Sequence, residues 1–202
     1  MITYNGNIVK KTYNGQSNWV RYGAAPSLPA YTIRLKFTEG VTPTFSKGTG
    51  SQVSASPNVW DLTYENADWS LLLRNQRNLI EVIDANTTGV TKMYQMFETC
   101  TALTTVQLFD TSAVTYMYSM FSGCSSLTAI PLFDTSSATQ TNSMFSSCFK
   151  VETGALALYQ QMSTQATPPP SHSRTFYRCG RDTVTGAAEL AQIPSGWGGT
   201  GN

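Results

Sequence analysis

The chain has 202 residues, of which 41% are hydrophobic and 12% charged, and its formal net charge is +1. The apolar fraction is sufficient for a buried core, whereas the low charge, without a run of basic residues, excludes the phosphate contacts on which nucleic-acid binding depends. Eighteen or more consecutive apolar residues, the length that spans a bilayer, occur nowhere, and the N-terminus lacks the cationic start and apolar run of a secretory leader. We therefore expect no nucleic-acid partner, no membrane insertion and no leader.

Residues 1–26 contain two Asn-Gly pairs, at positions 5–6 and 14–15, each preceded by Thr-Tyr. Asn-Gly favours the two-residue turns of β-hairpins, so this segment predicts an N-terminal β-hairpin. A stretch rich in Ala and Pro at 24–29 is typical of a linker. We interpret residues 1–26 as a separate attachment segment.

Residues 27–75 predict a β-rich N-terminal cap. From Tyr31 to Phe37 apolar and polar residues alternate, which is the period-two pattern of a half-buried strand, and residues 59–64 give a second strand. Residues 38–57, rich in Gly, Ser, Thr and Pro, predict turns and an irregular segment. Residues 68–73 predict a short helix that covers the open end of the part that follows.

A repeated phrase dominates the sequence from residue 76 onward. Met-Phe-x-x-Cys recurs every 24 residues and ends at Cys100, Cys124 and Cys148. A fixed period of this length is typical of stacked coils, in which these cysteines are expected to form a structural ladder of buried, reduced thiols. Their spacing lacks the close pairs of a zinc site, and parallel side chains are poorly arranged for disulfides.

Each coil is predicted to contain an inward-facing strand, a turn and a helical return. The strand corresponds to Leu-x-x-Val/Ile, and stacked strands would form a parallel sheet. Asp110 and Asp134 come after it, where their side chains are expected to cap the turn and so belong to the structural ladder. The apolar spacing of Val114, Met117 and Met120 indicates a short helix packed on that sheet.

The period changes after Cys148. Residues 153–166 contain helix formers and end before three prolines, so they predict an inserted helix. Phe176-x-x-Cys179 repeats the earlier phrase and predicts a longer, last coil. The coil domain is therefore placed at residues 76–197 with a C-terminal cap, followed by a glycine-rich tail at 198–202.

The segment Leu-x-x-Ile-Pro-Leu-Phe-Asp-Thr-Ser at 127–136 and the Met-Phe-x-x-Cys-x-x-Leu phrase resemble the BspA-like leucine-rich repeat family. The resemblance implies a right-handed solenoid and a role in surface attachment or recognition, as in surface proteins of gut and oral bacteria, in parasites, and in phages of Bacteroides-like hosts. It carries over no catalytic residue. The expected fold class is an α/β repeat: a right-handed leucine-rich-repeat solenoid of 24-residue coils with a small N-terminal β-rich module.

These expectations favour a structural or recognition protein of a phage virion: a head fibre, a decoration protein or a tail-associated protein. Residues 1–26 would dock on a capsid or tail protein, and the coils would face outward, in a particle assembled in the host cytoplasm. Symmetric attachment would favour a homo-oligomer. A bacterial cell-surface adhesin, or a passenger domain of a larger exported protein, is the alternative, and an intracellular interaction module is a third reading.

An enzyme is not expected, because a nucleophile–histidine–acid arrangement would have to use the single histidine, His172, which has no obvious partner in the sequence. We predict no cofactor and no metal site, since one Asp per coil is too few oxygen ligands for calcium. A possible partner-binding surface, for a glycan or a protein on a host surface, is predicted from outward positions of the coils. Its residues are Tyr94, Tyr116, Tyr118, Thr105 and Gln107.

Overall fold

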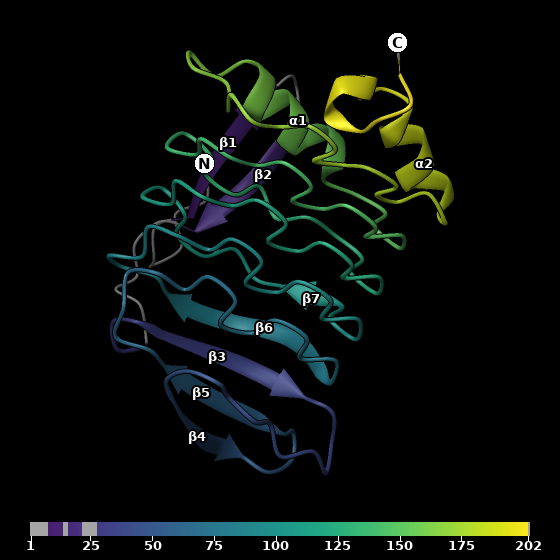
Figure 1. Ribbon diagram of the computed structural model, residues 1–202. Coiled ribbons are helices and arrows are strands. Elements are labelled where there is room, and N and C mark those ends of the chain that lie inside the picture. Colours follow the sequence, from purple (N-terminus) through teal and green to yellow (C-terminus); the bar gives the residue numbers. More distant parts are fainter. Residues whose placement is uncertain (1–7, 14–15, 22–27, 202) are drawn as a thin grey trace.

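The computed structural model describes residues 8–13, 16–21 and 28–201 (Figure 1). The strands come first in the chain and the helices last, so strands and helices do not alternate. The strands are β1 (Ile8–Tyr13), β2 (Gln16–Arg21), β3 (Thr32–Phe37), β4 (Thr49–Ser54), β5 (Val59–Thr63), β6 (Leu79–Asn86) and β7 (Thr105–Val106), and the helices are α1 (Ala155–Ser163), α2 (Val184–Leu190) and the 3-10 helix η1 (Ser195–Trp197).

A mixed five-stranded sheet, in the order β4-β5-β3-β6-β7, forms one end of the molecule (Figure 1). Its neighbours pair antiparallel except β6 and β7, which are parallel. Across β3 and β5, Arg34 donates to both carboxylate oxygens of Asp61 at 2.7 and 2.8 Å, which fixes the register of the two strands. β1 and β2 pair with each other, antiparallel, in a separate two-stranded sheet.

After β6, the chain stacks in segments 24 residues long. Alternate backbone N–H groups of one segment donate to carbonyl groups of the next, as Met93 N–H does to Tyr116 O at 2.9 Å. The N–H groups between them bond within their own segment, as Met96 N–H does to Met93 O at 3.3 Å. Hydroxyls extend the stack, since Thr115 Oγ1 donates to Thr91 O at 3.1 Å. The many Ser and Thr residues of the chain thus contribute to the contacts between segments.

The expected α/β leucine-rich-repeat solenoid is wrong. The described residues form a small, mostly-sheet domain with two short helices and a single mixed sheet. The β1–β2 pair is separate from that sheet. The helical return predicted around Met117 and Met120 is absent because Ser119, between them, has a φ of 52°. That left-handed backbone is incompatible with an α-helix, so the segment forms turns instead.

The predicted parallel sheet is also much shorter than expected. β7 has only two residues, and its pairing with β6 covers Glu81 with Thr105 and Val82 with Val106. Beyond it, this edge continues as an isolated bridge between Ala129 and Thr153. The extended ladder of leucine-rich-repeat strands is therefore replaced by turns joined by single bridges.

Columns of identical side chains fill the interior. The rings of Phe97, Phe121, Phe145 and Phe176 stack in sequence, with centroids 5.0, 5.3 and 6.2 Å apart and planes within 6° of parallel. Methionine, cysteine and leucine columns accompany them, and all belong to one buried cluster that extends from β3 to Trp197. Each fully buried ring contributes roughly 1.5–3 kcal/mol through the area it removes from water.

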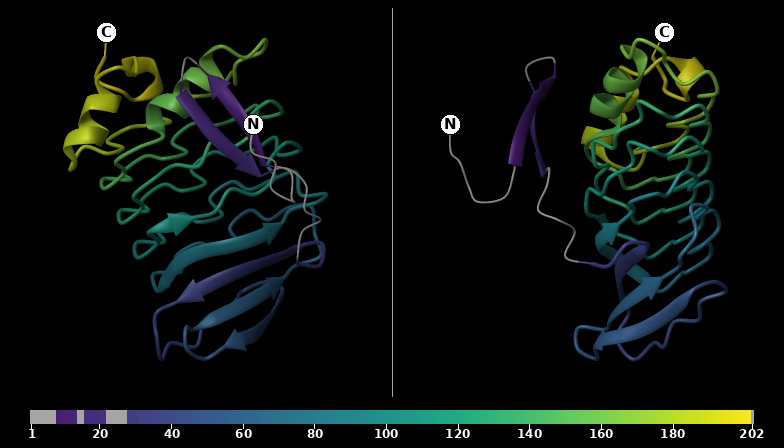
Figure 2. Two further views of the ribbon diagram at one scale, coloured as in Figure 1. Left: turned by 180° about the vertical axis from the view of Figure 1, so that it is seen from behind. Right: turned by 90° about the vertical axis from the view of Figure 1, so that its left-hand side faces the viewer.

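The helices cover the opposite end from the sheet, as both views of Figure 2 show. α1 lies within the predicted inserted helix at 153–166, so this prediction is confirmed. At the start of α1, the backbone N–H groups of Gly154 and Leu156 donate to the carboxylate of Glu189. Trp197, buried in η1, contacts Tyr159 of α1 edge to face at 5.5 Å, and so joins the helices into one cap.

Local differences from the sequence predictions lie mainly in the cap before the stack. The strands predicted at 31–37 and 59–64 are confirmed as β3 and β5, but the short helix at 68–73 is wrong, because Leu71 has a φ of 64°. β4 lies in a segment expected to be irregular, and α2 was not predicted. β1 and β2 lie where a hairpin is predicted; the division into segments 1–26, 27–75, 76–197 and 198–202 stays a prediction.

Candidate functional site

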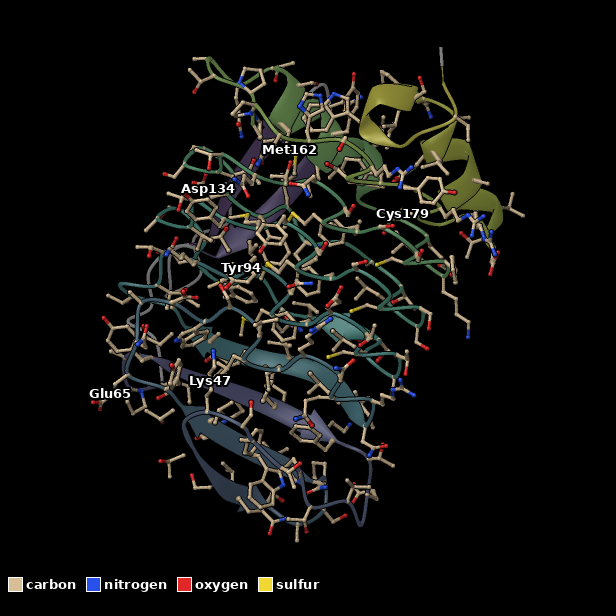
Figure 3. The ribbon with its side chains drawn as sticks, in the orientation of Figure 1. Lys47, Glu65, Tyr94, Asp134, Met162 and Cys179 are labelled. Atoms are coloured by element: carbon tan, nitrogen blue, oxygen red, sulfur yellow. The ribbon has the colours of Figure 1, made fainter. Side chains whose placement is uncertain are left out.

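Three of the predicted surface tyrosines come together on neighbouring segments of the stack. Isolated bridges align Lys92 with Tyr116 and Tyr116 with Gln140, and the next row, two residues later, contains Tyr94 and Tyr118. Figure 3 places Tyr94 in the middle of the stack. We call these positions the tyrosine surface; its residues are Lys92, Tyr94, Tyr116, Tyr118, Gln140 and Asn142.

The backbone of each segment turns these side chains outward. Tyr94 and Tyr118 are each followed by a residue in the left-handed region, Gln95 with φ 53° and Ser119 with φ 52°. Met93 and Met117, which precede them, are fully buried, whereas the tyrosines are half-buried. Because every segment repeats this sequence of inward and outward positions, outward side chains of successive segments lie directly over one another.

The tyrosine surface is held together by ring contacts. Tyr94 and Tyr118 stack with centroids 4.8 Å apart and planes 6° from parallel, a separation close to the spacing of paired strands. Lys92 Nζ lies 5.8 Å from the ring centroid of Tyr116 and 3.9 Å from a carboxylate oxygen of Asp68. These contacts order two pairs on neighbouring segments, Tyr94 with Tyr118 and Lys92 with Tyr116.

The phenol group of Tyr118 is a hydrogen-bond donor rather than an anion. Burial raises the pKa of Tyr118, and the neighbouring Tyr94, Asp68 and Glu98 raise it further. A tyrosine with a raised pKa keeps its proton at neutral pH, so its hydroxyl both donates and accepts.

The stacking limits which partners the rings suit. A sugar that packs on an aromatic ring needs an open ring face, but Tyr94 and Tyr118 each cover one face of the other. The rows of the stack that carry these tyrosines also contain Lys92, Gln140 and Asn142. Ordered aromatic rings with polar edges resemble the central residues of protein–protein interfaces more than a sugar platform.

Thr105 and Gln107 do not belong to the tyrosine surface. Both are exposed, Thr105 in β7 and Gln107 immediately after it, and β7 is hydrogen-bonded to β6. They therefore lie on a different row of the stack. Sequence analysis missed Lys92, Gln140 and Asn142, although the 24-residue spacing from Tyr116 and Tyr118 could have identified all three.

The cysteines lie in a column, as the sequence predicts. Each thiol is buried and donates to a backbone carbonyl of the preceding segment at 3.1 Å: Cys100 to Leu73 O, Cys124 to Phe97 O and Cys148 to Phe121 O. Burial raises the pKa of Cys100 and of Cys148 to about 12, and that of Cys124 also lies well above its ordinary value. All four cysteines are free and fully protonated at neutral pH, so none is an activated nucleophile.

Asp110 and Asp134 cap turns. The carboxylate of Asp110 accepts from the N–H of Ser112, and that of Asp134 from the N–H of Ser136, both at 2.9 Å. In addition, Thr111 Oγ1 donates to Asp134 O at 2.8 Å and so links the two turns. These carboxylates are engaged in local structure, in agreement with the turn-capping role predicted for them.

His172 packs inside the C-terminal cap. Its ring stacks on Trp197 with centroids 4.0 Å apart, and Nδ1 lies 2.8 Å from Pro169 O. The contacts place it in a structural position. Within the described part of the chain, no three histidine, cysteine or acidic side chains are grouped so that they could hold a metal ion, and no helix is long and apolar enough to cross a membrane.

An open hollow of about 600 Å³ lies at the sheet end of the stack, lined by residues 44–46 and 74–78. Its lining is more polar than apolar, and it contains two arginines, Arg74 and Arg77. Arg74 is already paired with Glu98. The hollow therefore lacks the enclosed apolar walls of a small-molecule site.

Comparison with known proteins gives one match. No curated protein and no solved structure matches the chain. These comparisons give no support for the expected description as a phage virion protein and no specific assignment to the BspA-like family, only a match to one family model. Residues 57–166, more than half of the chain, match that family, and the protein belongs to the family described as "Mycoplasma protein of unknown function, DUF285".

Proposed function

We propose that this protein is a non-catalytic recognition protein that attaches to a protein partner through the tyrosine surface. The observation that carries the proposal is the stack of Tyr94 on Tyr118 beside Tyr116 and Lys92. The resemblance of the Met-Phe-x-x-Cys phrase to BspA-like surface proteins also supports an attachment role.

Preorganisation is the physical reason why this surface suits binding. Side chains that are already ordered lose little conformational entropy when a partner covers them. Tyr94 and Tyr118 order each other, and Lys92 is held between Asp68 and the ring of Tyr116. Interfaces draw most of their binding energy from a few such aromatic anchors.

Attachment also needs a second contact that displays the tyrosine surface. We assign this role to residues 1–26, which include the β1–β2 pair, through a protein on the displaying particle or cell. Display of several copies would make the assembled form a homo-oligomer. Two settings are compatible with this role: a particle assembled in a bacterial cytoplasm, and a bacterial cell surface.

Binding of the purified, labelled protein to cells from the source culture tests the proposal. We expect protease treatment of those cells to abolish binding and periodate oxidation of their glycans to leave it intact. Replacement of both Tyr116 and Tyr118 by Ser should weaken binding at least about tenfold, because two anchoring rings are lost. Replacement of Thr105 and Gln107 by Ala, on the other exposed row, is the matched control and should have no effect.

Equal binding by the tyrosine variant and the native protein would refute the proposed surface. Sensitivity to periodate alone would replace the protein partner by a glycan. Mass spectrometry of purified particles, compared with that of peptides released from the surface of intact cells, distinguishes the two settings.

A further inference from the structure

The last segment of the stack ends in a group of cations around one aromatic ring. Residues 171–178 continue the rows of the tyrosine surface, since Ser143 N–H donates to Ser173 O at 3.0 Å and Ser147 N–H to Tyr177 O at 2.8 Å. At this last segment, Arg174 and Arg178 occupy the two left-handed positions, each with a φ of 57°. We refer to Arg174, Tyr177 and Arg178 as the arginine–tyrosine cluster. It lies next to Cys179, which Figure 3 labels toward the helix-covered end of the molecule.

The backbone of the cluster has unused donors. In every earlier segment, the N–H groups at these two positions donate to a carbonyl of the following segment. At the first position the pairs are Leu71 to Tyr94 O, Gln95 to Tyr118 O, Ser119 to Asn142 O and Ser143 to Ser173 O. At the second they are Asn75 to Glu98 O, Thr99 to Ser122 O, Gly123 to Ser146 O and Ser147 to Tyr177 O. Among the described residues, no acceptor bonds the N–H of Arg174 or Arg178. Trp197 O, which accepts from Phe176 N–H at 2.9 Å, continues the ladder at the intermediate position only.

The guanidinium groups of the cluster also have unused donors. Arg174 Cζ lies 5.5 Å and Arg178 Cζ 5.2 Å from the ring centroid of Tyr177. A guanidinium group over a ring uses its face, while its N–H donors point outward in its own plane. No ion pair within the described residues joins either arginine to a carboxylate.

Two of the three acidic side chains after residue 134, Glu189 and Asp182, are engaged elsewhere. Glu189 accepts from the backbone at the start of α1, and Asp182 pairs with Arg181 at 3.2 Å. Arg181 additionally lies over the ring of Phe149, with its Cζ 4.4 Å from the centroid. Lys150, which follows Phe149, is exposed, and so is Glu152. Residues 135–202 contain four Lys or Arg and three Asp or Glu side chains, a small positive excess.

We propose that the arginine–tyrosine cluster binds paired carboxylates of an acidic polypeptide segment. Each carboxylate would accept two in-plane N–H bonds from one guanidinium group, and the backbone N–H groups of Arg174 and Arg178 supply further donors. The Tyr177 ring, 39% exposed, offers an apolar contact for the CH₂ groups of a glutamate.

A polypeptide fits this cluster better than a nucleic acid. Neutralisation of a phosphate backbone needs a line of cations, and beyond the cluster the neighbouring rows present Ser143, Ser146 and Ser147 rather than Lys or Arg. Two forked cations on one ring match two carboxylates a few residues apart. The site lies beyond the proposed tyrosine surface and does not depend on it.

Titration of the full chain with an oligoglutamate peptide, followed by fluorescence anisotropy of the labelled peptide, tests this inference. We expect binding at low ionic strength that weakens as salt is added. The double variant Arg174→Gln, Arg178→Gln should bind at least about tenfold more weakly, because both forked contacts are lost. Arg174→Lys with Arg178→Lys keeps the charge but not the forked geometry, and should restore only a small part of the affinity.

The matched control carries Lys36→Gln and Arg77→Gln, which remove the same charge far from the cluster in the sequence. It should bind as the native chain does. An equal loss in the control, equal competition by inorganic phosphate or oligothymidylate, or no binding of the peptide at any ionic strength would overturn the inference. Circular dichroism establishes that each variant is folded; if the Gln variant is not, comparison of the Lys variant with the native chain decides the question. None of these readouts involves the tyrosine surface, so either site can fail alone.

Discussion

The buried thiols show how one residue type serves the same purpose in successive segments. A cysteine is small enough for the column and donates one weak hydrogen bond, and Cys100, Cys124 and Cys148 each use it on a carbonyl of the segment before. Those carbonyls would otherwise have one acceptor site unused in an apolar interior. The recurrence of Cys in the sequence therefore reflects packing and hydrogen bonding.

Alkaline pH should destabilise the protein through these thiols. Burial raises the pKa of Cys100 and Cys148 to about 12, whereas a thiol of the unfolded chain loses its proton near pH 8.5. Between about pH 8.5 and 12 the unfolded state therefore binds fewer protons, and each buried thiol lowers the free energy of unfolding by about 1.4 kcal/mol per pH unit. Urea unfolding followed by tryptophan fluorescence at increasing pH measures this slope.

The variant Cys124→Ala supplies the control for this prediction. It removes one titrating thiol whose pKa is also raised well above the ordinary value. The free energy of unfolding should fall less steeply with pH, by the contribution of one thiol. The variant should also be less stable at every pH, because the substitution leaves a small cavity. An unchanged slope would mean that the alkaline transition has another origin.

At the scale of elements, the sequence predicts the strands with alternating residues and the longest helix, but not the turns that stand where a helical return is expected. The residue patterns of β3, β5 and α1 are compatible with few other local structures. The spacing of Val114, Met117 and Met120 suits a helix equally well as the observed turns, because both bring apolar residues inward every three or four positions. β4, with the sequence Thr-Gly-Ser-Gln-Val-Ser, has no apolar alternation, and it is specified by its pairing with β5 instead.

The left-handed residues of the turns give a stability prediction. Gly123 has a φ of 76°, and a Cβ there would be 3.3 Å from Thr99 Cγ2. The equivalent Thr99 and Ser147 adopt this conformation with side chains, at φ 58° and 62°. Gly123→Ala should therefore cost about 1 kcal/mol of unfolding free energy, and Ser147→Gly should add up to about 1 kcal/mol. Thermal unfolding of both variants measures the two effects.

The neighbouring substitution Ser146→Gly is the matched control. Ser146 is not among the residues with positive φ, so glycine relieves no strain there and only increases the freedom of the unfolded chain. It should lower the melting temperature. If Ser146→Gly and Ser147→Gly changed the melting temperature in the same direction, backbone strain at Ser147 would not be the cause of its effect.

For the whole molecule, the candidate site could be predicted only where the repeat exposes its residues. Tyr94, Tyr116 and Tyr118 stand at outward positions of well-aligned segments, so their proximity follows from the 24-residue spacing. Thr105 and Gln107 are outward too, but on another row, and spacing along the chain does not distinguish rows. The arginine–tyrosine cluster escapes such reasoning because it depends on where the stack ends.

Removal of residues 1–26 should leave the rest of the protein folded. Among the described strands, β1 and β2 pair only with each other, and the five-stranded sheet is formed from β3 onward. We therefore expect the same far-ultraviolet circular dichroism per stacked segment and a melting temperature within about 2 °C of the native value, together with loss of attachment. A truncated protein that still joins its particle or cell surface would show that attachment lies elsewhere.

The thiol column has a consequence for where such a protein can work. With all four thiols sealed from solvent and none joined to another, the folded chain requires neither an oxidant to form nor a reductant to survive. The same architecture can thus pass from the reducing interior of a cell to air-exposed surroundings without any change in covalent structure.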